Sequence, residues 1–184
     1  MIEIVPYSPN WPIEFEHIAA PIRNALGGLA LRVDHIGSTS VPGLAAKDIV
    51  DVQVTLPDFD AIDRVTAALT AIGYTLRPDI IADHCPPSVE GPDSDWEKRL
   101  FNPPPGQRPT NLHVRAQGRA NQRYALLFRD YLRAHPLAAS AYAEVKRRLA
   151  HYHAEDSLAY TTIKDPVCDL IMNAAEAWQR MENR

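Results

Sequence analysis

The stretch HIGSTSVPGLAAKDIVDVQV, residues 35–54, places small and hydroxyl-bearing residues directly before an alternating segment. Turn N–H groups and hydroxyls over Gly37-Ser38-Thr39-Ser40 suit a phosphate group, and Lys47 brings a positive charge to the same end. The patterns GxxxxGK[ST] and GxGxxG are both absent, so neither a P-loop nor a Rossmann nucleotide site is predicted. A phosphate-binding loop of another kind is one interpretation, and an ordinary polar turn is the other.

Asp51 and Gln53 lie two residues apart in the alternating segment DIVDVQVTL. This spacing puts both side chains on one face of a strand, with Val50, Val52 and Val54 on the other face. A carboxylate and an amide oxygen at this spacing are candidate ligands for a divalent cation. Because the amide is neutral, the pair carries half the negative charge of two carboxylates.

The segment TNLHVRAQ, residues 110–117, alternates in the same way. Asn111, His113 and Arg115 share one face of the expected strand, and the apolar residues share the other. If this strand neighbours the earlier one, Asp51, Gln53, His113 and Arg115 form the best candidate for an active centre. The alternative is a solvated sheet face that holds a cross-strand ion pair.

Several arginines flank the turn before this segment, and guanidinium groups suit phosphate and carboxylate ligands. Most of them are expected to be solvated surface charges. From their positions, Arg99 and Arg115 are the first choices for a group that lines a pocket.

The segments around these residues predict an α+β fold. Apolar spacing predicts helices over 10–26 and 58–72, and alternation predicts strands over 30–37 and 48–56. WEKRLFN and TNLHVRAQ around the turn PPPGQRP predict a β-hairpin. From residue 120 onward the pattern is helical, with a last helix that begins properly at Pro166. We expect a mixed sheet with helices packed on one face, followed by a C-terminal helical segment.

The composition of the 184 residues indicates a soluble globular protein with 46% hydrophobic and 23% charged residues. A formal net charge of −4 argues against nucleic acid or an anionic membrane as a partner. With two cysteines, no secretory signal and no long apolar run, a cytoplasmic location is expected. The sequence does not indicate the oligomeric state.

The motif GSTSVPGLAAK, with NLHVR, FRDYLRAHP and the tyrosine and lysine of AYTTIK in the expected order, closely resembles the GrpB family. The likeness extends over nearly the whole chain. It implies one GrpB-like domain over 1–184, with a nucleotidyltransferase-like core over 1–118 and C-terminal helices over 119–184. The family is also associated with dephospho-CoA kinase and carries a label as a protein-folding accessory domain.

GrpB-like proteins are similar in fold to nucleotidyltransferases, which implies a nucleoside triphosphate and Mg²⁺ or Mn²⁺ as cofactors. By this resemblance Gly37-Ser38 match the phosphate-binding step and Asp51 matches the first metal-binding carboxylate. Gln53 departs from the second carboxylate, and His113 stands near the position of a third. Such a donor set suits Zn²⁺ or Ni²⁺ better than Mg²⁺.

The resemblance leaves two main functions open. The first is transfer of a nucleotidyl group to a small-molecule acceptor, with a divalent metal at Asp51, Gln53 and His113. The second is a module that binds a nucleotide, a coenzyme A fragment or a carboxylate without turnover, as the missing second carboxylate favours. Lys164 matches a family motif position, and two interpretations of it stay open: a group that reaches an anion, and an ordinary lysine on a helix surface. A folding-assistance role for the C-terminal helices ranks last.

Overall fold

A mixed five-stranded sheet forms the centre of the chain, in the order β1-β2-β5-β4-β3. The computed structural model describes residues 1–87 and 89–182. The strands β2 and β5 run parallel, and every other neighbouring pair is antiparallel. The strands are β1 (Arg32–Ile36), β2 (Val50–Leu56), β3 (Thr75–Arg77), β4 (Arg99–Asn102) and β5 (Thr110–Ala116).

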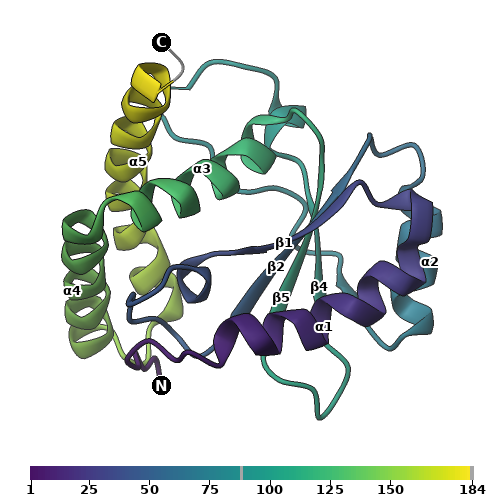
Figure 1. Cartoon of the computed structure of the whole chain (residues 1–184), viewed down its shortest axis with the longest axis horizontal. Helices are drawn as coiled ribbons and strands as arrows, with labels where there is room; N and C mark the ends of the chain where they lie inside the picture. The colour runs from purple at the N-terminus through teal and green to yellow at the C-terminus, as the bar shows by residue number, and fades with distance from the viewer. Residues whose placement is uncertain (88, 183–184) are drawn as a thin grey trace.

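The helices gather in two groups on different sides of this sheet, as Figure 1 shows. The first group is α1 (Trp11–Leu26) and α2 (Ile62–Ala71). The second group is α3 (Ala120–Ala134), α4 (Pro136–Tyr152) and α5 (Ser157–Glu182), which pack against one another. In the part of the chain that the structure describes, no helix combines the length and the apolar content needed to cross a bilayer.

The apolar face of the sheet packs against α1 and α2. Val52 and Val54 of β2 and Leu112 of β5 are fully buried there. They share one cluster with Ile22 of α1 and Leu69 of α2. Alternation explains this core, because every second residue of β2 and β5 is apolar and points to the same side.

The opposite, polar face of the sheet is turned toward α3, α4 and α5. Two arginines of α3 attach these helices to the sheet by hydrogen bonds to backbone carbonyls, one in β1 and one in the loop that follows it. Arg129 Nη1 donates to the His35 carbonyl at 3.0 Å, and Arg133 Nη2 donates to the Ser40 carbonyl at 2.8 Å. A second apolar cluster joins Val41 and Leu44 after the loop to the three helices. The C-terminal helical segment therefore covers the residues in which chemistry is expected.

The α+β class, the mixed sheet and the hairpin β4–β5 agree with the sequence prediction. The predicted start of the last helix at Pro166 is wrong, since α5 already begins at Ser157 and contains that proline. The Asp156 carboxylate accepts a hydrogen bond from the Ala159 N–H at 2.8 Å and so caps the earlier start. Pro166 removes one N–H from the middle of the helix, and packing on α3 and α4 outweighs this loss.

Leu112 lies fully buried in β5 at the centre of the sheet, so Leu112→Ala leaves a cavity in the apolar core. We expect it to lower the free energy of unfolding by about 2–5 kcal/mol. The matched control Leu137→Ala removes the same atoms from a side chain that is 88% exposed on α4, and its expected change is within about 0.5 kcal/mol. Urea unfolding measures both. Equal losses would contradict the assignment of the core to this face.

Candidate functional site

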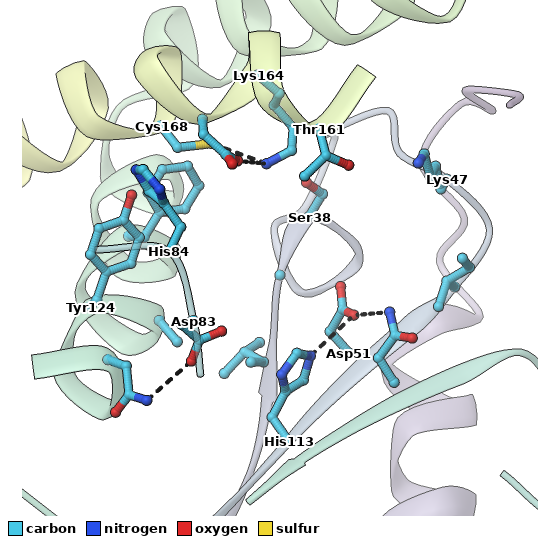
Figure 2. A pocket seen from close by; sticks show the side chains of 18 of the residues that line it. Ser38, Lys47, Asp51, Asp83, His84, His113, Tyr124, Thr161, Lys164 and Cys168 are labelled. Atoms are coloured by element: carbon cyan, nitrogen blue, oxygen red, sulfur yellow. Dashed lines mark hydrogen bonds and ion pairs between the residues drawn. The ribbon is translucent and has the colours of Figure 1, made fainter. Parts of the chain in front are cut away.

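A cavity of about 520 Å³ lies between the polar face of the sheet and the C-terminal helices. Its walls come from the Gly-Ser loop after β1, from β2 and β5, from residues 82–84, 96 and 98, and from α3, α4 and α5. Figure 2 shows side chains of α5 and of the sheet pointing into the same space. A volume of this size is typical of a pocket for a small molecule.

The Gly-Ser loop is locked into one conformation on the floor of the cavity. Gly37 has a φ of +69° and a ψ of −173°, a combination that is essentially confined to glycine. A Cβ atom at Gly37 would collide with the Asp51 carboxylate. Ser40 Oγ donates to the Gly37 carbonyl at 2.6 Å, and Thr39 Oγ1 lies 3.0 Å from His35 Nε2. The hydroxyls of Thr39 and Ser40 therefore hold the turn.

Asp51 forms a polar cluster with two side chains of β5. The parallel register sets Asp51 beside Asn111 and Gln53 beside His113. Asn111 Nδ2 donates to Asp51 Oδ1 at 2.8 Å, and His113 Nε2 lies 3.9 Å from the same oxygen. Burial opposes ionisation of Asp51, but His113 and Asn111 outweigh it and hold the pKa of Asp51 below its usual range.

His113 has a defined orientation in this cluster. Its Nδ1 atom lies 3.3 Å from Arg115 Nη2. Because a guanidinium group only donates, Nδ1 accepts this bond and the ring proton is assigned to Nε2, which faces Asp51. Burial, together with the charge of Arg115, lowers the pKa of His113. His113 is therefore a neutral imidazole that donates toward the carboxylate at neutral pH.

Gln53 does not face the cavity as a free ligand, which corrects the expectation that it binds a metal. Its side chain is fully buried. Gln53 Oε1 accepts a hydrogen bond from Arg115 Nη1 at 2.6 Å, and Gln53 Nε2 donates to the Gln122 carbonyl at 3.3 Å. Both ends of the amide are thus used to join the sheet to α3.

Arg115 belongs to a buried charge cluster at the other end of the cavity. Arg115 Nε donates to Asp83 Oδ2 at 2.8 Å, and Lys98 Nζ donates to Asp83 Oδ1 at 2.6 Å. Asn121 Nδ2 also donates to Asp83 Oδ2, at 3.1 Å. Burial works against the charged carboxylate, yet these cations hold the pKa of Asp83 far below its usual range. Arg115 lines the cavity, but its guanidinium is held by Asp83 and Gln53.

Arg99 lies on the wrong face of the sheet to line the cavity, so that expectation is also corrected. In the antiparallel register Arg99 is paired with Val114, and paired residues point to the same side. Its guanidinium contacts Glu97 Oε1 at 3.1 Å and lies 5.4 Å from the centre of the Phe59 ring. Arg99 is a surface group on the α2 side.

Three lysines, Lys47, Lys146 and Lys164, line the cavity. Lys47 Nζ lies 4.0 Å from the centre of the Tyr160 ring. Lys164 Nζ lies 3.2 Å from Asp165 Oδ1 and 3.5 Å from Cys168 Sγ. Lys146 Nζ donates to Ser38 Oγ at 2.8 Å. These lysines come from three different segments of the chain.

The sequence patterns did not single out Lys146, although its position on the buried face of α4 could have indicated it. It stands four residues after Tyr142 and three before Leu149, which are both on the buried face of α4. A lysine inside an apolar stripe at helical spacing is exceptional, because isolated buried charges are costly. Asp83 was missed because it ends a possible strand over 74–83, and nothing local indicates that its carboxylate meets Arg115 and Lys98.

The predicted site residues thus fall into two sets. Those that line the cavity are Gly37, Ser38, Thr39, Lys47, Asp51, His113, Arg115 and Lys164. Ser40, Gln53 and Arg99 do not line it; the first two support the walls, and Arg99 lies on the opposite face.

A family model described as "GrpB protein" matches residues 1–174. The chain belongs to the GrpB family. A UPF0157 protein of Halalkalibacterium halodurans is 37% identical over 96% of this chain and 83% of its own length. A dephospho-CoA kinase of Mycolicibacterium paratuberculosis is 37% identical over 90% of this chain. The match covers 44% of that kinase, so the chain spans less than half of it.

Solved structures agree with this assignment. GrpB from Enterococcus faecalis is 29% identical, with a TM-score of 0.78, and the match covers 96% of this chain and 99% of that one. A cytoplasmic RNA terminal U-transferase matches with a TM-score of 0.51 and 14% identity, over 82% of this chain and 43% of the transferase. The second likeness shows that this GrpB chain shares a nucleotidyltransferase-like fold.

The GrpB cavity does not fit a resident metal ion. Over residues 1–87 and 89–182, no group of three or more His, Cys, Asp and Glu side chains is arranged to hold one. The side chains in polar contact with Asp51 are those of Asn111 and His113, and the Asp83 oxygens are occupied by cations. A two-metal transferase centre needs several carboxylates to bind its hard cations. The predicted metal site at Asp51, Gln53 and His113 is therefore not supported by the donor set.

Gly37→Ala is expected to disrupt the floor of the cavity. The positive φ alone costs an alanine about 1–3 kcal/mol, and the new Cβ also collides with the Asp51 carboxylate. Gly43→Ala is the matched control, since Gly43 also has a positive φ of 79°, but a Cβ atom added there would meet nothing within 4 Å. Thermal unfolding should show the larger loss for Gly37→Ala. A loss that is equal in the two variants would disprove the close approach to Asp51.

Asp83→Asn leaves Arg115 and Lys98 without a counter-charge in a buried place. We expect a loss of about 3–5 kcal/mol in the free energy of unfolding. Asp79→Asn removes an exposed partner of Arg77 and should change stability little.

The ion pairs of Asp83 with Arg115 and Lys98 also predict that the stability depends on pH. The pKa of Asp83 in the folded protein lies below its unfolded value of 3.8, so its contribution is present above that value and is lost as the pH falls. Unfolding curves in acid should therefore be less steeply pH-dependent for Asp83→Asn than for the wild type. An unchanged acid profile would contradict the role of the buried carboxylate.

Proposed function

We propose that this GrpB protein binds a small phosphorylated molecule of the nucleotide class in the cavity beneath the C-terminal helices. The observation that carries the proposal is that Lys47, Lys164 and the Ser38–Lys146 pair line the same cavity. Lysine ammonium groups and a serine hydroxyl are suitable partners for phosphate oxygens. The whole chain has a net charge of −4. The gathering of lysines in the cavity is therefore a local feature and does not follow from a basic composition.

The other walls of the cavity suit the remainder of a nucleotide. Trp96, Tyr124 and Phe128 line one side, and the rings of Tyr124 and Phe128 are parallel, with centroids 6.0 Å apart. Aromatic side chains of this kind favour a flat base by stacking. Asp51 and Asn111 offer an acceptor and an amide to sugar hydroxyl groups. The cavity volume of about 520 Å³ accommodates one such ligand.

Binding without turnover is favoured over nucleotidyl transfer by the chemistry of the polar face. The position where a transferase would have a second carboxylate is Gln53, whose amide is bonded to Arg115 and to α3. Transfer to a small-molecule acceptor with Mg²⁺ or Mn²⁺ is the second candidate function. The close approach of Gly37 to Asp51 favours it, because the resemblance to transferases expects a glycine and a first carboxylate together.

The names of the relatives suggest which ligands to test first. The match with the dephospho-CoA kinase of Mycolicibacterium paratuberculosis covers 44% of that protein. Coenzyme A and dephospho-CoA carry an adenosine and a diphosphate, so both belong to the class proposed for the cavity. That this chain binds either of these two ligands is part of the proposal.

Removal of a cavity lysine should weaken nucleotide binding. Lys164→Met deletes one charged hydrogen-bond donor, and such bonds contribute about 1.5–3 kcal/mol, so affinity for ATP or dephospho-CoA should fall about tenfold or more. Arg99→Met is the matched control, because it removes a cation from the opposite face of the sheet. Isothermal titration calorimetry measures both, and at 100 times the dissociation constant the ligand should stabilise the wild type by about 2.7 kcal/mol.

Two outcomes would revise this function. An equal loss of affinity in Arg99→Met and Lys164→Met would remove the cavity as the binding site. Release of pyrophosphate from a nucleoside triphosphate with Mg²⁺ or Mn²⁺, abolished in Asp51→Asn and detected by mass spectrometry, would establish the second candidate in place of simple binding.

A further inference from the structure

Ser38 and Lys146 form a direct pair at the cavity wall. Lys146 Nζ lies 2.8 Å from Ser38 Oγ, although the two residues are separated by 108 positions in the sequence. Ser38 is partly exposed to the cavity, whereas Lys146 is only 3% exposed. The serine hydroxyl is thus open to a ligand while its partner is shielded from water.

The surroundings of Lys146 favour a neutral amine. Within the described part of the chain no carboxylate forms an ion pair with it, and its ammonium group lies 4.6 Å from the centre of the Tyr142 ring. Burial lowers the pKa of Lys146 to about 7. The charged and titratable groups that act on it are Cys168 and Lys164 on α5, Asp51 on β2 and Arg147 on its own helix.

A serine hydroxyl beside a buried neutral lysine is an arrangement used for nucleophilic catalysis. The amine accepts the hydroxyl proton, which raises the nucleophilicity of the oxygen. Serine–lysine pairs replace the serine–histidine pair in some acyl-transfer enzymes, and they are recognised by geometry rather than by sequence position. General-base assistance of this kind contributes about 10²–10⁴ in rate.

We propose that Ser38 is a nucleophile with Lys146 as its general base, and that the cavity transfers an acyl group from an ester or thioester to water. This activity goes beyond ligand binding and needs none of the carboxylates that the site lacks. The apolar wall at Tyr124 and Phe128 would take the acyl chain. Lys47 and Lys164 would hold an anionic group of the alcohol or thiol portion.

The proposed reaction has two balanced halves. Ser38 Oγ attacks the carbonyl carbon, its proton passes to Lys146 Nζ, and the bond from the carbonyl carbon to the leaving oxygen or sulfur breaks. The leaving group takes the proton from Lys146. A water molecule then attacks the acyl-serine ester while Lys146 accepts its proton, which returns to Ser38 Oγ as the carboxylic acid departs. The positive charge of Lys164, which acts on Lys146, would favour the oxyanion formed in each half.

The test uses the full chain with a fluorophosphonate probe and with p-nitrophenyl acetate. We expect one covalent adduct per chain, mapped to Ser38 by peptide mass spectrometry, and a burst of p-nitrophenol. Ser38→Ala should abolish the adduct, and Lys146→Met should slow its formation by about 10²-fold or more. Ser140→Ala removes an exposed serine of α4 and should label like the wild type.

The pH profile separates a general base from a structural lysine. In the wild type the rate of adduct formation should rise between about pH 6 and pH 8, as Lys146 loses its proton, and then level off. In Lys146→Met this inflection should vanish. Because the wild-type profile needs no variant, the test stands even if Lys146→Met fails to fold.

Three results would overturn the proposal. They are no adduct at Ser38 above the inflection, an adduct whose rate is independent of pH in the wild type, and phosphorylation rather than acylation of Ser38 by a nucleotide ligand. Titration of ATP into the same samples distinguishes this failure from failure of the proposed binding function. Intact nucleotide affinity without an adduct removes the acyl transfer alone.

Discussion

The parallel pairing of β2 with β5 is the constraint on which the rest of the molecule depends. Its register sets Asp51 beside Asn111 and Gln53 beside His113. Because strands alternate, the same register sends the valines of β2 into the core with α1 and α2. A slip by one residue would exchange the two faces and place a carboxylate and an imidazole in the apolar core. The core and the cavity are therefore fixed by one set of hydrogen bonds.

The Gly-Ser loop connects this sheet to the C-terminal helices. Below the loop, the Asp51 carboxylate packs against Gly37 without room for a side chain. From the other side, Arg129 of α3 donates to the His35 carbonyl of β1, and Arg133 donates to the Ser40 carbonyl of the loop. The loop carbonyls are thus used for structure, while Ser38 remains turned to the cavity and to Lys146. This division explains how one short turn both supports the fold and presents a hydroxyl group to the cavity.

Alternation made the polar face of β2 and β5 predictable, because it needs only local spacing and the assumption that the strands are neighbours. Arg99 was assigned to the wrong face because a side chain in a hairpin follows the register, which neighbouring residues do not reveal. Lys146 and Asp83 depend on long-range packing. The first is brought to Ser38 by a helix 108 positions away, and the second meets Arg115 across 32 positions of sequence. Local sequence patterns therefore predicted the sheet side of the cavity and missed most of the helical side.

The neutral side chain of Gln53 has a consequence for the charge balance of the whole cavity. A neutral amide at this position satisfies one arm of Arg115 without cancelling its charge, so the guanidinium still needs an anion. Asp83 supplies that anion from the segment before β4 and thereby ties this segment to the sheet and to α3. One acidic group is thus committed to structure, and Asp51 is left as the carboxylate beside Asn111 and His113. This division of the acidic charge supports our proposal that the cavity binds an anion through its lysines rather than a divalent cation.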